Sequence, residues 1–166
     1  CAAAATRSEI TLRNVPEQEL QAFLEVYQKI GGQYQANGGT LEVNGKRAVQ
    51  PIALVETKNY PGFPTDLQAP LMAVLTGAQG RSSIRENIFD QRFGSAFQMN
   101  KMGADIKIDG NQAVICGGRP LTGTQVQAGD LRGGAALIIA ALMAVTLFSG
   151  LAWFAGNFSL VICSQS

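Results

Sequence analysis

Two stretches of alternating apolar and polar residues, each followed by a helical pattern, dominate the chain. The alternation predicts strands over 8–14 and 82–87. A helix opens after the first strand at Pro16, because proline is tolerated at the first helical position. Its apolar stripe, at helical spacing, comprises Leu20, Phe23, Leu24, Tyr27 and Ile30. A helix over 89–102 is expected after the second strand, and its apolar side would hold Phe93, Phe97 and Met102.

Short turn motifs predict further strands. Asn37-Gly38-Gly39 and Asp109-Gly110-Asn111 each favour a tight hairpin turn. The second turn joins strands that we expect over 104–108 and 113–116. One more strand is expected over 52–56, where apolar residues again come in a short run.

A helix over 67–75 is expected after the break at Pro64. Thr65 and Gln68 have the spacing of a capping box, in which the two side chains satisfy backbone N–H groups at the start of a helix. Asp66 would then lie in the first turn, where an acid is favoured.

The strand–helix–strand plan occurs twice. Arg7-Ser8-Glu9-Ile10 matches Arg81-Ser82-Ser83-Ile84, and Ile30-Gly31-Gly32 matches Lys101-Met102-Gly103 at the helix end. The period of about 70 residues is too long for a solenoid and is typical of a duplicated supersecondary unit. A third copy begins at Asp130, and we expect it to be incomplete.

The composition excludes several classes of function. The net charge of +1 gives no field that favours nucleic acid, so no nucleic-acid partner is expected. The absence of histidine excludes His-based acid–base catalysis and His metal sites. We expect neither a metal nor a cofactor. The cysteines Cys1, Cys116 and Cys163 are far apart and form no CxxC pair, which favours a reducing cytoplasm.

Charge is absent from positions 133–166, although the chain has 13 basic and 12 acidic residues. The stretch 133–163 is long and apolar enough to resemble a transmembrane helix. Polar and glycine residues interrupt it, and no basic flank follows. We therefore expect a core helix over about 131–143, with a membrane-anchored domain as the alternative.

The chain divides into a domain over 1–144 and an uncharged apolar tail over 145–166. Its opening Cys1-Ala2-Ala3-Ala4-Ala5 resembles the middle of a helix, and no secretory signal pattern is present. We expect the chain to begin inside a longer protein.

Two acidic corners are the strongest candidates for chemistry. Asp66-Leu67 and Asp130-Leu131 each stand at the expected start of a helix, where free N–H groups and the helix dipole favour anionic ligands. Arg92 and Arg132 also have two interpretations: each is a solvated charge on its helix, or each binds a phosphate or carboxylate. Asp66 has two interpretations: it stabilises its own helix dipole, or it acts as a general base toward a substrate hydroxyl.

These motifs together resemble the family of UDP-N-acetylglucosamine 1-carboxyvinyltransferases, over about Ala2 to Ala144. In order, they are FPTDLQA at 63–69, IFDQRF at 88–93, MGAD at 102–105, LTG at 121–123 and DLR at 130–132. The PTD and DLR motifs favour this family over the related enolpyruvyl transferase of the shikimate pathway. The resemblance implies an α/β (α+β) fold, an inverted α/β barrel of repeated strand–helix–strand units. The chain would be most of the second of two domains, with its third unit incomplete.

The resemblance also implies an activity. The family moves the enolpyruvyl group of phosphoenolpyruvate to the 3-hydroxyl of UDP-N-acetylglucosamine, releases phosphate and opens peptidoglycan synthesis. Asp66 matches the acid that accepts the hydroxyl proton. The positions that match substrate contacts are Ile88, Phe89, Arg92, Asp130, Leu131 and Arg132.

The chain departs from the family pattern at several points. It has Asp90-Gln91 where the family has Glu-Asn, and Gly133-Gly134 where the family has Ala-Ser. The family's later His-Ile-Asp-Arg-Gly-Tyr segment and its first domain are absent. We therefore expect this chain alone to be inactive. The alternative is a non-catalytic module of the same fold that binds a nucleotide sugar or a partner.

Overall fold

The computed structural model describes residues 1–148, so most of the expected tail lies outside the described residues. The helices are α1 (Ala2–Thr6), α2 (Gln21–Lys29), α3 (Gln68–Leu75), α4 (Gly94–Lys101) and α5 (Leu131–Phe148), with 3-10 turns at Glu17–Leu20 and Thr65–Leu67. The strands are β1 (Glu9–Leu12), β2 (Gln33–Asn37), β3 (Thr40–Asn44), β4 (Val55–Glu56), β5 (Gly80–Arg85), β6 (Ile106–Asp109) and β7 (Gln112–Gly117).

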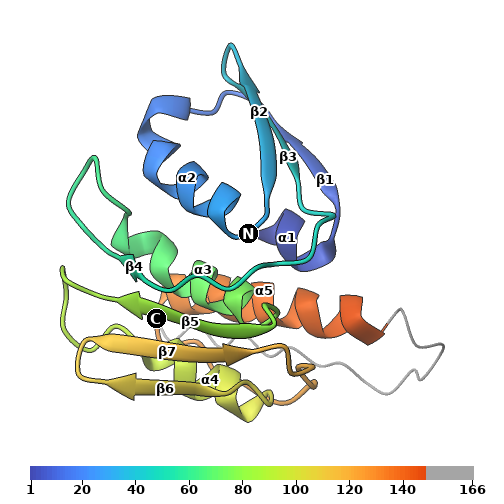
Figure 1. Cartoon of the computed structure of the whole chain (residues 1–166). Coiled ribbons are helices and arrows are strands. Elements are labelled where there is room, and N and C mark those ends of the chain that lie inside the picture. Colours follow the sequence, from blue (N-terminus) through green and yellow to red (C-terminus); the bar gives the residue numbers. More distant parts are fainter. Residues whose placement is uncertain (149–166) are drawn as a thin grey trace.

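The strands form two sheets that share one plan. The first is antiparallel in the order β1-β3-β2, and the second has the order β4-β5-β7-β6 with β4 parallel to β5. The order β5-β7-β6 repeats β1-β3-β2, which confirms the predicted duplication. In Figure 1 the first sheet stands at the top and the second at the bottom, with α3 and α5 between them. Both sheets are open, so residues 1–148 contain no closed barrel.

The structure corrects the predicted register of the repeat. Gly31 and Gly103 both end a helix with φ 94°, so Gly31 corresponds to Gly103 and not to Met102. Glu9 pairs with Asn44 as Arg81 pairs with Cys116. Because Asn44 and Cys116 each precede an equivalent glycine, Glu9 corresponds to Arg81. The predicted strand alignment was therefore two residues out.

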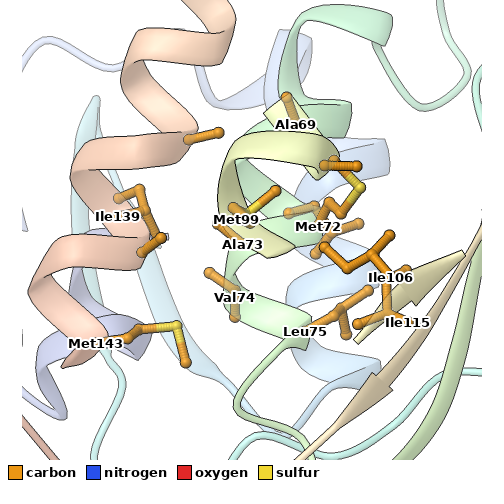
Figure 2. Close-up of a cluster of buried hydrophobic side chains, with 14 of the residues drawn as sticks. Ala69, Met72, Ala73, Val74, Leu75, Met99, Ile106, Ile115, Ile139 and Met143 are labelled. Carbon is orange, nitrogen blue, oxygen red and sulfur yellow. The ribbon is translucent and has the colours of Figure 1, made fainter. Parts of the chain in front are cut away.

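The core forms around the helix that joins the two units. All eight residues of α3 are buried, and α3 packs against α5 and the second sheet. In Figure 2 Val74 lies toward Ile139 and Met143 of α5, whereas Leu75 lies toward the strand residue Ile115. A helix that is apolar on all sides is stable in water only when neighbours cover it completely.

Small residues bring helices and strands close together. α1 buries Ala3, Ala4 and Ala5 and packs against α5. A Cβ atom on Gly45 would lie 2.1 Å from the carbonyl oxygen of Ala3, and one on Gly117 would lie 2.3 Å from that of Ala78. Glycine is therefore required where β3 and β7 end, since Gly45 meets the backbone of α1 and Gly117 meets the backbone that follows α3.

Two predicted elements are shorter than expected, and one side chain lies on the other side of its helix. The strand expected over 52–56 is only Val55–Glu56. The helix expected over 89–102 is Gly94–Lys101, because the chain turns at Gln91, which has φ 56°. Phe97 is 64% exposed, so its predicted place on the apolar side was wrong, whereas Phe93 and Met102 are buried.

The apolar helix α5 continues to Phe148, beyond its expected end near position 143. It is packed against the core by its buried alanine, leucine and isoleucine residues. Over residues 1–148, no helix has both the length and the apolar character needed to cross a membrane.

Candidate functional site

The two acidic corners predicted from the sequence lie next to each other. Asp66 lies in the turn before α3, and Arg132 lies in the first turn of α5. The Nε atom of Arg132 donates a hydrogen bond to Oδ1 of Asp66. Nη1 of Arg92, from the loop before α4, lies 3.4 Å from the same oxygen. The fold thus brings three predicted residues from three segments into one cluster, which we call the acid–arginine cluster.

The two acids have different roles in the structure. Asp130 caps α5, since its Oδ1 accepts hydrogen bonds from the backbone N–H groups of Arg132 and Gly133, both at 2.9 Å. Asp66 forms ion pairs with Arg92 and Arg132, and its side chain is 59% exposed. It is therefore open to a ligand, whereas Asp130 holds the helix that carries Arg132.

The predicted capping box at the start of α3 is absent. Over the described part of the chain, neither the 3-10 turn nor α3 has a side-chain cap. The hydroxyl of Thr65 donates instead to Oε2 of Glu86, at 2.8 Å. The capping-box prediction was therefore wrong, because a tertiary partner competes for the Thr65 hydroxyl.

Glu86 is the structural centre of the site, and the sequence analysis missed it. It is 2% exposed. Its Oε1 accepts hydrogen bonds from the hydroxyl of Thr57 and from the backbone N–H groups of Ile88 and Phe89, at 2.8, 2.8 and 3.2 Å. Four donors compensate the buried carboxylate, as burial of a charge requires. Glu86 thereby joins the turn of Asp66 to the loop of Arg92.

A sequence signal for Glu86 did exist. Ser82 and Ile84 are buried and alternate with exposed or half-buried neighbours. The same alternation makes Glu86, directly after β5, the next inward position. A charged residue at an inward position marks either a hydrogen-bonded network or a site.

The three apolar residues assigned by resemblance lie around the cluster. The ring of Phe89 is half exposed, and the guanidinium of Arg92 lies 4.0 Å from its centre, in cation–π contact. Ile88 is half-buried and fixed through its N–H group. Leu131 is 88% exposed at the start of α5.

Electrostatics in the cluster favour charged side chains. The hydrogen bond and charge of Arg132 lower the pKa of Asp66, and Arg92 contributes in the same direction. The same contact raises the pKa of Arg132. Asp66 is therefore ionised at neutral pH but is a weakened base while Arg132 is paired with it. An anion that draws the arginines away would raise the basicity of Asp66.

A pocket of about 310 Å³ opens beside the cluster. The starts of three helices line it, with Gln68 from α3, Ser95 from α4, and Arg132 and Gly133 from α5. Helix starts present free N–H groups and the positive end of the helix dipole. Among residues 1–148, no group of three or more acidic or cysteine side chains is placed to hold a metal ion.

The repeated strand–helix–strand units and the buried helices between them define a protein of the enolpyruvyl transferase fold. The enolpyruvyl transferase NikO from Streptomyces tendae superposes with a TM-score of 0.74 over 86% of this chain and 34% of that chain, at 22% identity. An EPSP synthase from Acinetobacter baumannii superposes with a TM-score of 0.66, over 86% of this chain and 34% of that one, at 18% identity. The family model of EPSP synthase (3-phosphoshikimate 1-carboxyvinyltransferase) matches residues 1–147, and the chain belongs to that family.

Curated relatives within the family share more sequence. UDP-N-acetylglucosamine 1-carboxyvinyltransferase 2 of Clostridium tetani is 48% identical over 143 residues, which are 86% of this chain and 34% of the relative. A second relative, UDP-N-acetylglucosamine 1-carboxyvinyltransferase 1 of Carboxydothermus hydrogenoformans, is 42% identical over 90% of this chain and 36% of its own length. The chain thus spans about a third of the length of these relatives.

Proposed function

We propose that this chain supplies one side of the active site of an enzyme that transfers the enolpyruvyl group of phosphoenolpyruvate to the 3-hydroxyl of UDP-N-acetylglucosamine. The observation that carries the proposal is the acid–arginine cluster. It combines a candidate base, Asp66, with two cationic side chains, Arg92 and Arg132, beside a pocket. The names of the relatives support this substrate pair over others.

The roles follow from the chemistry of the reaction. Asp66 accepts the proton of the sugar hydroxyl as the oxygen attacks phosphoenolpyruvate, and elimination then releases phosphate. Arg92 and Arg132 hold the anionic substrate, since planar guanidinium groups suit phosphate and carboxylate oxygens. Ile88 and Phe89 contact the UDP-sugar, and Asp130 and Leu131 lie beside the arginines.

We further propose that residues 1–144 are a partial transferase domain followed by an uncharged apolar tail over 145–166, the first residues of which continue α5 to Phe148. We also propose that the protein works in the cytoplasm in peptidoglycan synthesis. A first domain would complete the two-sided site. Because the sugar and phosphoenolpyruvate need contacts from both sides, residues 1–166 alone do not catalyse the reaction. Purified chain given both substrates should release no phosphate, and measurable release would overturn this statement.

Calorimetric titration with UDP-N-acetylglucosamine tests the binding role. Asp66→Ala should weaken binding by about tenfold or more, since a hydrogen bond to a charged group contributes about 1.5–3 kcal/mol. The matched control is Asp109→Ala, because Asp109 is an exposed acid on the β6–β7 hairpin. Equal affinity of both variants and the unmodified chain would count against the proposed role of Asp66.

A further inference from the structure

Two buried polar groups beside the acid–arginine cluster have no hydrogen-bond partner within residues 1–148. They are Nε2 of Gln68 and the hydroxyl of Ser95. Gln68 is 1% exposed and Ser95 is 7% exposed. A buried polar group without a partner is destabilising, and native proteins keep few of them without a functional reason. Both residues line the pocket that Arg92 and Arg132 also line.

Open space lies next to these residues, although the two unpartnered atoms themselves are buried. Gln68 is the first residue of α3, and Ser95 lies in the first turn of α4. A Cβ atom on Gly94 would meet no atom within 4 Å. Gly94, Ser95 and Gly133 also line a second pocket, of about 270 Å³. We call the space lined by Gln68, Gly94, Ser95 and Gly133 the inner compartment.

The chemistry of the inner compartment favours an acceptor group. Nε2 of Gln68 only donates hydrogen bonds, and the hydroxyl of Ser95 is able to donate one. The guanidinium groups of Arg92 and Arg132 add further donors. Asp90 and Asp130 also line the pocket, but Oδ1 of Asp130 is occupied by the first turn of α5. Hydrogen-bond donors that lack a partner and lie next to two guanidinium groups are suited to bind an oxyanion.

We propose that Gln68 and Ser95 donate hydrogen bonds to an oxygen of a phosphate or carboxylate group that enters the inner compartment beside Arg92 and Arg132. The inference rests on the proposed function, since it gives the anionic substrate two ligands in addition to the arginines. It also explains why an α3 that is otherwise apolar keeps a buried glutamine at its start.

Nuclear magnetic resonance of the full chain tests the proposal without any substitution. The probes are inorganic phosphate and pyruvate, which separate a phosphate source from a carboxylate source. The side-chain NH2 signals of Gln68 should shift and saturate with at least one probe. The side-chain NH2 signals of Gln79, an exposed glutamine outside the pocket, should stay in place.

Substitutions give a second and independent readout. Gln68→Leu combined with Ser95→Ala should weaken binding of the effective probe by about tenfold or more, which is the loss of at least one hydrogen bond to a charged group. The midpoint of thermal unfolding of the free double variant should be unchanged or higher, because an unpaired buried group is replaced by an apolar one. A purely structural role predicts a lower midpoint. Gln79→Leu is the matched control for both measurements.

Three outcomes would overturn the inference. Unchanged affinity of the double variant, with Arg92 and Arg132 signals still shifting, would leave the proposed function intact and remove Gln68 and Ser95 from it. Failure of both probes to bind while UDP-N-acetylglucosamine binds would also reject the oxyanion role alone. Failure of all three ligands to bind would reject both the inference and the proposed function.

Discussion

At the scale of single residues, the Asp66–Arg132 pair sets the chemistry of the site. Because the hydrogen bond from Arg132 is the largest cause of the lowered pKa of Asp66, Arg132→Ala should raise that pKa toward its ordinary value. Arg92→Ala should raise it less. Carbon-13 NMR of the Asp66 carboxyl group during a pH titration measures both shifts, and Arg119→Ala is a control whose partner is Asp105. Identical titration curves for the unmodified chain and the three variants would show that the arginines do not lower the pKa of Asp66.

The lowered pKa of Asp66 also determines how the Asp66–Arg132 ion pair depends on pH. A carboxyl group with a lowered pKa in the folded state stabilises that state above its ordinary pKa, and the contribution is lost as the pH falls through the lowered value. The pair should therefore be fully formed at neutral pH and lost only in acid. Since Asp66 is largely exposed, solvent screens the contribution and it is small.

Gln91 is strained by its backbone conformation. Its φ of 56° is in the left-handed region, where asparagine is tolerated better than glutamine. The family pattern has asparagine here, so Gln91→Asn should stabilise the chain by about 0.5–1 kcal/mol. Urea unfolding measures the change. Gln127→Asn, at an exposed loop position without a positive φ, should not stabilise it, and equal effects of the two variants would argue against strain at Gln91.

At the scale of elements, Glu86 holds two loops in place. Its side chain accepts hydrogen bonds from Thr57, Thr65, Ile88 and Phe89. Glu86→Gln replaces a charged acceptor by an amide that cannot accept at both ends, so the free energy of unfolding should fall by about 2–3 kcal/mol. Glu42→Gln, an exposed position on β3, is the control. A change below 0.5 kcal/mol, on the order of an ordinary surface substitution, would show that the network contributes little.

Two glycines test the equivalence of the repeated units. Gly45→Ala and Gly117→Ala should each destabilise the chain by about 1–3 kcal/mol or more, because the new Cβ atoms would meet backbone carbonyl oxygens at 2.1 and 2.3 Å. Gly94→Ala meets no neighbouring atom and should be neutral or slightly stabilising at a helix start. Tolerance of alanine at both positions in urea unfolding would refute the close helix–strand contact.

The helices and hairpins were largely predictable, and the reasons are local. The turns at Gly38 and Gly110 and the end of α2 at Gly31 follow from backbone conformations that favour glycine. The start of α4 was not predictable in the same way. The turn before it places Gln91 at a positive φ, where glycine or asparagine would be the usual signal. The register of the repeat slipped by two residues since alternation is unchanged by a shift of two.

At the scale of the whole molecule, the two repeated units meet at α3 and α5 and place the acid–arginine cluster where those helices begin. The sequence motifs predicted that Asp66, Arg92 and Arg132 belong together, and the structure confirms their proximity. The network of Glu86 and the unpartnered Gln68 and Ser95 were not predicted. Both depend on side chains from separate segments meeting in three dimensions, which no local pattern specifies.

We expect the start of α3 and the start of α5 to form one binding site for an anionic sugar nucleotide. Titration of the labelled chain with UDP-N-acetylglucosamine, followed through backbone amide signals, tests it most directly. Saturable shifts are expected at Asp66, Ile88, Phe89 and Arg132, and none in β2 or β3. Shifts confined to the first sheet, or a well-dispersed spectrum that does not change at all, would contradict it.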